Sequence, residues 1–226
     1  MGQYCYFGMV FGILLPLWLV VFSLAHGTIK RRMVIVGAVF AIYGLICTLT
    51  FKDYWHPNFV LGFPLLEDIG YGFLFGGLVN GLMPLLLGLK SERAVGKRNY
   101  RLVFLYAMIS ALLFVTVPYV LQLNSIWALI IVPFVVGLIA LAVTKEIFLR
   151  YVLNAILAMA VTILMYRGAM LFSPTIIQDY FYLDKTSGVL LFGIPLEEYL
   201  FAFALGFGCT SAYESASGRR LSAIGA

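Results

Sequence analysis

Long runs of apolar residues, separated by short polar connectors, make up most of the chain. Each run has about the 20 apolar residues that a helix needs to cross the hydrocarbon core of a bilayer. The runs are too long and too uniformly apolar for barrel strands, and backbone polar groups in lipid must be paired within a segment, so we predict helices. The sequence thus predicts an all-α integral membrane protein with seven transmembrane helices, at residues 4–25, 33–51, 63–89, 102–123, 125–144, 151–172 and 189–213.

Composition supports a lipid environment. Hydrophobic residues make up 63% of the 226 residues and charged residues only 11%, which leaves too few polar side chains to cover a water-soluble domain of this size. All three cysteines lie in apolar runs and there are only two histidines, so we expect no metal site of ordinary spacing. No GxGxxG motif follows a predicted strand, and we therefore expect no dinucleotide or other cofactor.

The basic residues predict the orientation of the bundle. They gather in alternate loops and in the C-terminal tail, which the positive-inside rule assigns to the cytoplasm, so we expect an external N-terminus in a multi-pass protein of the cell membrane. Contact with anionic lipid head groups explains these residues, and the net charge of +5 does not indicate a nucleic-acid partner. The residues are Lys30, Arg31, Arg32, Lys90, Arg93, Lys97, Arg98, Arg101, Lys145, Arg150, Arg219 and Arg220.

A short motif occurs twice in the chain. Each copy has a proline followed within four residues by an acidic pair, and an Asp-Tyr pair lies upstream of each. The two prolines are 131 residues apart, and the intervening helices give both copies the same direction, which predicts a parallel repeat. We expect one membrane domain over residues 1–226, with halves at about 1–100 and 101–213 and a cytoplasmic tail at 214–226. The motif residues are Asp53, Pro64, Glu67 and Asp68 in the first half and Asp179, Pro195, Glu197 and Glu198 in the second.

The acidic pairs have two interpretations. A proline followed by carboxylates is typical of a helix start, where the positive end of the helix dipole stabilises negative charge. Ionisable groups at a membrane-spanning run are costly, however, and usually mark function, and the motif occurs twice. The first pair is shifted by one position relative to its proline. On a helix this rotates it by about 100°, so the sequence leaves open whether Glu67 and Asp68 face the same cavity as the second pair.

The run Gly193-Ile-Pro-Leu-Glu-Glu-Tyr-Leu-Phe201, followed by Tyr213-Glu214, resembles the lycopene cyclase domain family. These small membrane carotenoid cyclases have two homologous halves, either as separate subunits or fused in one chain. The resemblance implies a lycopene beta-cyclase-like isomerase whose substrate is a lipophilic linear carotenoid taken from membrane lipid. It implies a redox-neutral reaction: a proton adds to a terminal double bond, a neighbouring alkene attacks the cation, and loss of a proton leaves a six-membered ring.

Such a reaction needs an acid, a base, a wall that stabilises a cation, and the exclusion of water. Burial can keep a carboxylic acid protonated, so Glu67, Asp68, Glu197 and Glu198 are the catalytic candidates, with Glu197 assigned as proton donor and Glu198 as its partner. Aromatic rings stabilise cations, although packing alone also explains rings at this density. On this basis the predicted substrate-binding residues are Tyr71, Phe75, Tyr199 and Phe201.

Several alternatives stay open at the level of sequence. Arg167 could pair with Glu197 or Glu198 and give the acids a structural role. A cyclase of another isoprenoid, a proton or ion carrier, and a non-catalytic assembly partner all fit a membrane bundle with paired acids, and a homo-oligomer is left open. A retinal Schiff base is excluded because residues 189–213 contain no mid-helix lysine.

Overall fold

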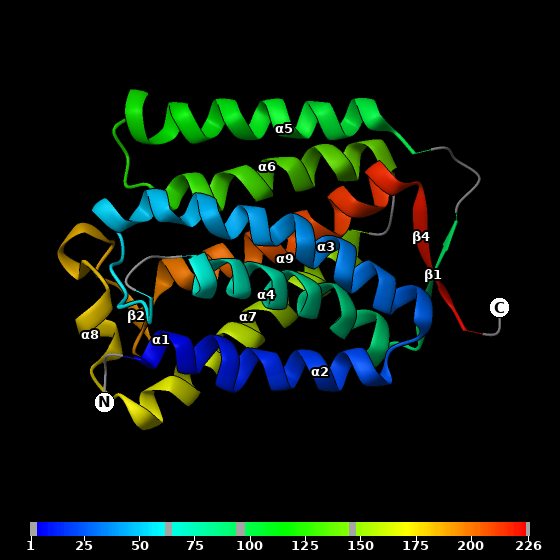
Figure 1. The fold of residues 1–226 in the computed structure, drawn as a ribbon. Helices are drawn as coiled ribbons and strands as arrows, with labels where there is room; N and C mark the ends of the chain where they lie inside the picture. Colours follow the sequence, from blue (N-terminus) through cyan, green and yellow to red (C-terminus); the bar gives the residue numbers. More distant parts are fainter. Residues whose placement is uncertain (1–3, 62–64, 94–97, 145–147, 225–226) are drawn as a thin grey trace.

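The protein is a bundle of long helices that lie alongside one another (Figure 1). The computed structural model describes residues 4–61, 65–93, 98–144 and 148–224. Each of the seven predicted segments contains a helix, which confirms that the protein is mostly helical. In chain order the helical elements are α1 (Cys5–Phe7), the π-helix Gly8–Leu14, α2 (Leu15–Leu24), α3 (Gly27–Ile46), the 3₁₀ helix Cys47–Lys52, α4 (Leu65–Leu86), α5 (Tyr100–Val115), the π-helix Thr116–Val120, α6 (Ile126–Thr144), α7 (Phe148–Phe172), α8 (Ile176–Tyr180), the 3₁₀ helix Leu183–Lys185 and α9 (Leu196–Ser217).

Six helical stretches in the described part of the chain are long and apolar enough to cross a membrane. The seventh, α9, has a similar length but is less apolar. It packs against α6 and α7, and most of its residues are buried. Other helices therefore cover most of α9, and few of its side chains reach the surface. The six spans are Cys5–Leu24, Gly27–Lys52, Leu66–Leu86, Tyr100–Val120, Ile126–Thr144 and Phe148–Phe172.

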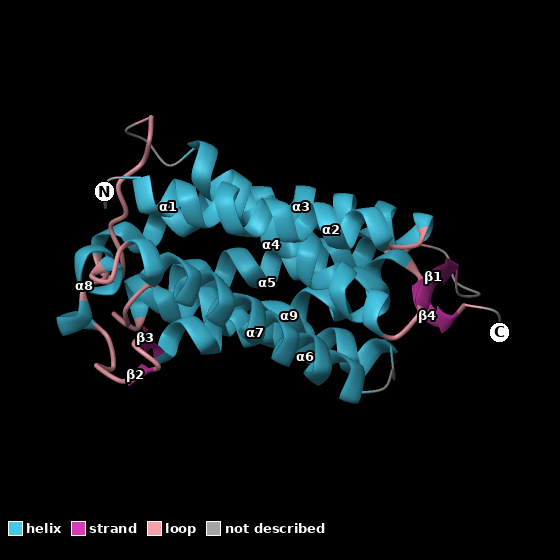
Figure 2. Ribbon diagram, turned by 90° about the horizontal axis from the view of Figure 1, so that it is seen from below, coloured by secondary structure: helices cyan, strands magenta, loops and turns pink. Residues whose placement is uncertain are grey.

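Two short antiparallel ladders lie at opposite ends of the bundle (Figure 2). At one end β1 (Leu89–Arg93) pairs with β4 (Arg219–Ala223), the strands that follow α4 and α9. At the other end β2 (Leu190–Leu191) pairs with β3 (Ile194–Pro195), close to α8 and to the starts of α4 and α9. The sequence prediction contained no strands.

Two predicted boundaries were wrong. The second helix begins at Gly27 and not at Met33, because the His26 side chain caps it by accepting a hydrogen bond from the Thr28 backbone N–H. The basic residues Lys30, Arg31 and Arg32 therefore lie in the first turns of α3 and not in a loop. The last helix begins at Leu196, because Phe192 and Gly193 adopt positive φ angles of 51° and 78° and turn the preceding residues into the β2–β3 hairpin.

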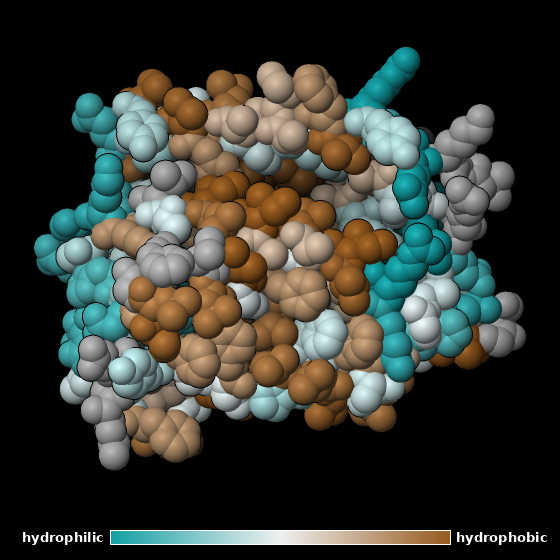
Figure 3. Space-filling model, in the orientation of Figure 1, coloured by the Kyte–Doolittle hydropathy of each residue, from teal (hydrophilic) through white to brown (hydrophobic). Residues whose placement is uncertain are grey.

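The surface agrees with membrane association. Apolar side chains cover the middle of the face drawn in Figure 3, and hydrophilic side chains gather toward its two ends. Many large apolar residues in the described helices are exposed, including Leu171 at 82% and Phe172 at 78%. A water-soluble protein rarely exposes an apolar surface this extensive.

Candidate active site

A small cavity lies inside the bundle at the end that carries α8 and the β2–β3 hairpin. Its volume is about 40 Å³, and α1, α4, α6, α7, α9 and the segment after α3 form its walls. Two carboxyl groups face it, one from the first turn of α4 and one from the first turn of α9. The lining residues are Tyr6, Cys47, Thr50, Tyr54, Trp55, Asp68, Tyr71, Ile126, Leu129, Met165, Tyr166, Glu198 and Phe201.

Asp68 is the carboxyl group from α4. The Tyr6 hydroxyl donates a 2.6 Å hydrogen bond to its Oδ1, while its Oδ2 is buried and has no hydrogen-bond partner among the described residues. Gly44 lets α3 approach this part of α4, since a Cβ at that position would overlap the Asp68 carbonyl oxygen. Asp68 thus has one oxygen fixed by a phenol and one oxygen left unpaired beside the cavity.

Glu198 is the carboxyl group from α9. The hydroxyls of Tyr54 and Tyr166 donate hydrogen bonds of 2.8 Å each, to Oε1 and to Oε2 respectively. Burial and the neighbouring Glu198 carboxylate raise the pKa of Tyr54 well above its usual range, so this phenol keeps its proton and stays a donor. Both oxygens of Glu198 therefore act as acceptors in a fixed position.

The other acid of each pair anchors a loop. Glu67 Oε1 accepts a 2.7 Å hydrogen bond from the Val60 backbone N–H, and Glu197 Oε1 accepts one of the same length from the Ser187 backbone N–H. Neither Glu67 nor Glu197 lines the cavity. Adjacent helical side chains point about 100° apart, which separates the two tasks within each pair.

The shift of the first motif does not turn Asp68 away from the site. Asp68 and Glu198 both line the cavity, and their residue numbers differ by 130, as do those of Glu67 and Glu197. This spacing is one less than the spacing of the prolines. Pro64 lies outside the described residues, and Pro195 is the last residue before α9.

The predicted aromatic residues divide between the cavity and its surroundings. Tyr71 and Phe201 line the cavity, and Phe75 stacks on Tyr71 with ring centroids 5.3 Å apart. Tyr199 instead donates a 2.7 Å hydrogen bond to the Leu191 carbonyl in the hairpin.

Sequence reasoning did not identify the three tyrosines that hold the carboxyl groups. Tyr54 carried a usable signal, because it is part of the repeated Asp-Tyr pair. Tyr6 and Tyr166 carried none, since nothing in their surroundings distinguishes them from the other tyrosines in apolar runs.

The remaining predicted site residues lie outside the cavity. Asp53 accepts hydrogen bonds from the backbone N–H and the hydroxyl of Ser125 and so fixes the start of α6. Asp179 is exposed and accepts a 2.7 Å hydrogen bond from Thr175. Arg167 is exposed and donates to the Phe192 carbonyl at 3.4 Å; it forms no ion pair with Glu197 or Glu198.

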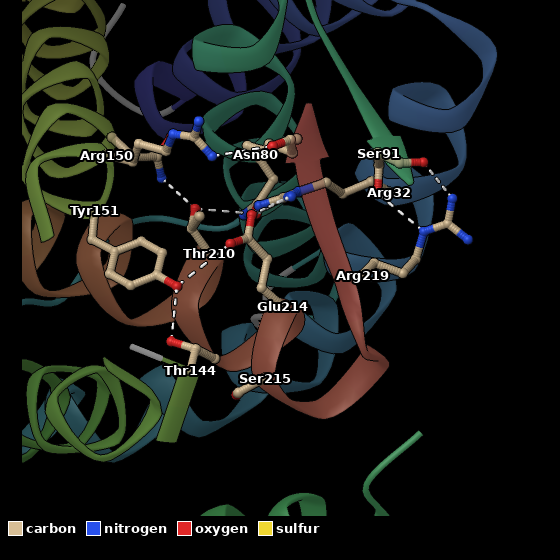
Figure 4. A network of polar contacts seen from close by, with 12 residues as sticks. Arg32, Asn80, Ser91, Thr144, Arg150, Tyr151, Thr210, Glu214, Ser215 and Arg219 are labelled. Atoms are coloured by element: carbon tan, nitrogen blue, oxygen red, sulfur yellow. Dashed lines mark hydrogen bonds and ion pairs between the residues drawn. The ribbon is translucent and has the colours of Figure 1, made fainter. Parts of the chain in front are cut away.

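A second polar cluster lies near the opposite end of α9 (Figure 4). Arg32 is completely buried, and its Nη1 lies 2.7 Å from Glu214 Oε1. Asn80 accepts from Arg32 and from Thr210, which joins α3, α4 and α9. Arg32 was predicted to lie in a cytoplasmic loop, and that prediction was wrong because the Glu214 carboxylate pairs with it inside the protein.

Comparison with known proteins supports one family. Residues 124–216, which include α6, α7 and α9, match the family model described as lycopene cyclase. No curated protein and no solved structure matches the chain. Within residues 4–61, 65–93, 98–144 and 148–224, no group of three or more His, Cys, Asp or Glu side chains could hold a metal ion.

Proposed function

We propose that this protein, whose residues 124–216 match the lycopene cyclase family model, closes rings at the ends of a linear carotenoid by adding and then removing a proton. The observation that carries the proposal is the pairing of Asp68 and Glu198 across one cavity. The reaction needs a proton donor and a proton acceptor on one substrate end, and this cavity brings two carboxyl groups together away from water.

We assign the role of proton donor to Asp68. Its Oδ2 is buried beside the cavity and unpaired among the described residues, so a proton on that oxygen could be given to a substrate alkene without breaking a hydrogen bond within the protein. Tyr6 holds the other oxygen and fixes the direction of the group. Glu197, the donor suggested by sequence, also has a buried oxygen, Oε2, with no partner among the described residues, but it is a weaker candidate because it does not line the cavity.

We assign to Glu198 the stabilisation of the cation and the removal of the final proton. Tyr54 and Tyr166 fix its two oxygens, so it presents acceptor lone pairs in a set place and needs little reorganisation during the reaction. The rings of Tyr71 and Phe201 line the same space and can stabilise positive charge through their faces.

The cavity must widen to admit a substrate end. Its 40 Å³ corresponds to about three water molecules at roughly 10–15 Å³ each, which is less than the end of a polyene needs. Substrate binding therefore requires movement of lining side chains, and a tight fit around the end of the chain would exclude water from the cation.

The proposal includes the membrane arrangement. We propose that α9 is the seventh span, that the two halves are parallel repeats, and that the acid cavity lies toward the non-cytoplasmic side of the cell membrane. In support, α4 and α9 both begin beside the cavity and both end at the β1–β4 ladder. An apolar substrate would then enter from lipid without crossing water.

Expression of the chain in cells that accumulate lycopene tests the function. We expect monocyclic or bicyclic carotene with the native sequence, and unchanged lycopene with the Asp68→Asn, Glu198→Gln double variant at equal protein level in the membrane. Leu112→Ala provides a control, because this side chain on α5 is exposed, does not line the cavity and takes no part in the hydrogen bonds of the two acids. If the native chain is well inserted and leaves lycopene linear, carotenoid cyclisation is the wrong assignment.

A further inference from the structure

A second and larger cavity lies between α3, α5, α6 and α9. It is a groove of about 820 Å³, and most of its wall is apolar. Its lining residues include Val39, Tyr43, Ala107, Val132, Leu205 and Ala212. Nothing in the catalytic assignment above uses this groove.

The groove opens toward the lipid-facing side of the bundle. α5 is the outermost helix and packs on α6 and on α9, and the groove occupies the space beneath it toward α3. The surface in Figure 3 is hollowed and hydrophobic below α5. An apolar molecule dissolved in the membrane could therefore enter sideways.

The groove follows the acid cavity along helices α6 and α9. On α6, Leu129 lines the cavity and Val132, about one turn further on, lines the groove. On α9, Phe201 lines the cavity and Leu205 lines the groove. The same three or four residues separate cavity from groove on both helices, so the two spaces adjoin.

Tyr43 lies between the acid cavity and the groove. Its ring lines the groove, and its hydroxyl donates a 3.0 Å hydrogen bond to the carbonyl of Leu129, which lines the cavity. This hydrogen bond connects α3 to α6. The Tyr43 ring also contacts the rings of Phe40 and Phe114, with centroids 5.7 and 5.8 Å away, so it must break this hydrogen bond and shift in its packing to turn aside.

We propose that the groove binds the linear chain of the polyene while its terminal group enters the acid cavity past Tyr43. This proposal rests on the proposed function, because it assumes that the acid cavity takes the end of a linear hydrocarbon. The groove supplies the apolar surface that a long uncharged chain needs, and its lateral opening gives the route from lipid. From Phe201 to Ala216, α9 extends about 22 Å at 1.5 Å per residue, so cavity and groove together suit a long rod-shaped ligand.

The cytoplasmic end of the groove is lined by Arg31, Arg98 and Arg219. A phospholipid with its phosphate on these arginines is the competing occupant. We favour the polyene because the groove adjoins the acid cavity, and the arginines suit the level of the head groups in either case.

Retention of pigment tests the groove separately from the chemistry. The Asp68→Asn, Glu198→Gln variant is purified from lycopene-accumulating cells, and the ratio of bound pigment to protein is measured. Adding Ala107→Phe, which fills the groove, should lower this ratio at least fivefold. Adding Ala111→Phe, one turn further along α5 and not part of the groove lining, should leave it unchanged.

Equal pigment retention by the Ala107→Phe and Ala111→Phe variants would overturn the proposal, and so would the absence of pigment from every variant. The proposal would also fail if the protein carried phospholipid instead of pigment, and if the Arg31→Ala, Arg98→Ala double substitution released that phospholipid. The proposed function fails differently. A native chain that retains lycopene in the groove and never cyclises it would contradict the function and leave the groove assignment intact.

Discussion

Asp68 and Glu198 line the same cavity although 130 residues separate them in the chain. Each sits in the first turn of a helix, and each accepts hydrogen bonds from buried tyrosine hydroxyls. The acid that precedes each of them accepts a backbone hydrogen bond from an upstream loop. One acid of each pair thus positions a loop and the other faces the space where chemistry can occur.

Removing the proposed proton donor should abolish turnover without unfolding the protein. Asp68→Asn keeps the shape and the acceptor for Tyr6 but has no acidic proton, and we expect the rate to fall about 10²–10⁴-fold, the range for loss of a general acid. The measurement is carotene formed per unit of membrane-inserted protein. Glu67→Gln is the matched control on the neighbouring residue; if it lowers the rate as much as Asp68→Asn, the assignment within the pair is wrong.

Glu197 should act through the loop and not through proton transfer. Glu197→Gln keeps an oxygen that can accept a hydrogen bond from the Ser187 N–H, so activity should stay within about threefold of the native chain. Glu197→Ala leaves that N–H unpaired and should lower the free energy of unfolding by about 1–3 kcal/mol. Activity and thermal unfolding in detergent are measured on both variants. Loss of activity in a stable Glu197→Gln protein would return the donor role to Glu197.

Little in the sequence separates these roles, although the helices themselves were predictable. The apolar runs predicted the helices, because a helix that crosses lipid needs a continuous apolar stretch. The repeated acidic pairs predicted the position of the site. The burial of Arg32 was missed because its pair with Glu214 depends on residues far apart in the chain. Tyr6 and Tyr166 were missed for the same reason, since only the packed bundle brings their hydroxyls to Asp68 and Glu198.

The buried pair of Arg32 and Glu214 should stabilise the contact between α3 and α9. Arg32→Met leaves the Glu214 carboxylate buried without its cation, and we expect a loss of about 3–5 kcal/mol in unfolding free energy. Arg32→Met combined with Glu214→Leu should recover much of that loss, because neither charge remains. Unfolding in mixed micelles measures both. A double variant no more stable than Arg32→Met alone would contradict this account.

The proposed orientation predicts which loops can be labelled from outside the cell. Asp184 lies in the connector near the acid cavity, and Arg98 lies at the opposite end before α5; both are exposed. In intact cells, a membrane-impermeant maleimide should label Asp184→Cys and should label Arg98→Cys only after permeabilisation. The native chain serves as the blank, since Cys47 and Cys209 are buried and Cys5 is partly buried. The reverse labelling pattern would show that the bundle has the opposite orientation in the membrane.

The most direct test of the central claim follows the proton itself. Membranes containing the protein are supplied with unlabelled lycopene in buffer made with D₂O, and the carotene product is examined by mass spectrometry. Acid-initiated closure adds one deuteron and releases one proton for each ring, so we predict a gain of one deuterium per ring at otherwise unchanged mass. A cyclic product without deuterium would contradict the transfer of a solvent-exchangeable proton from Asp68 to the substrate.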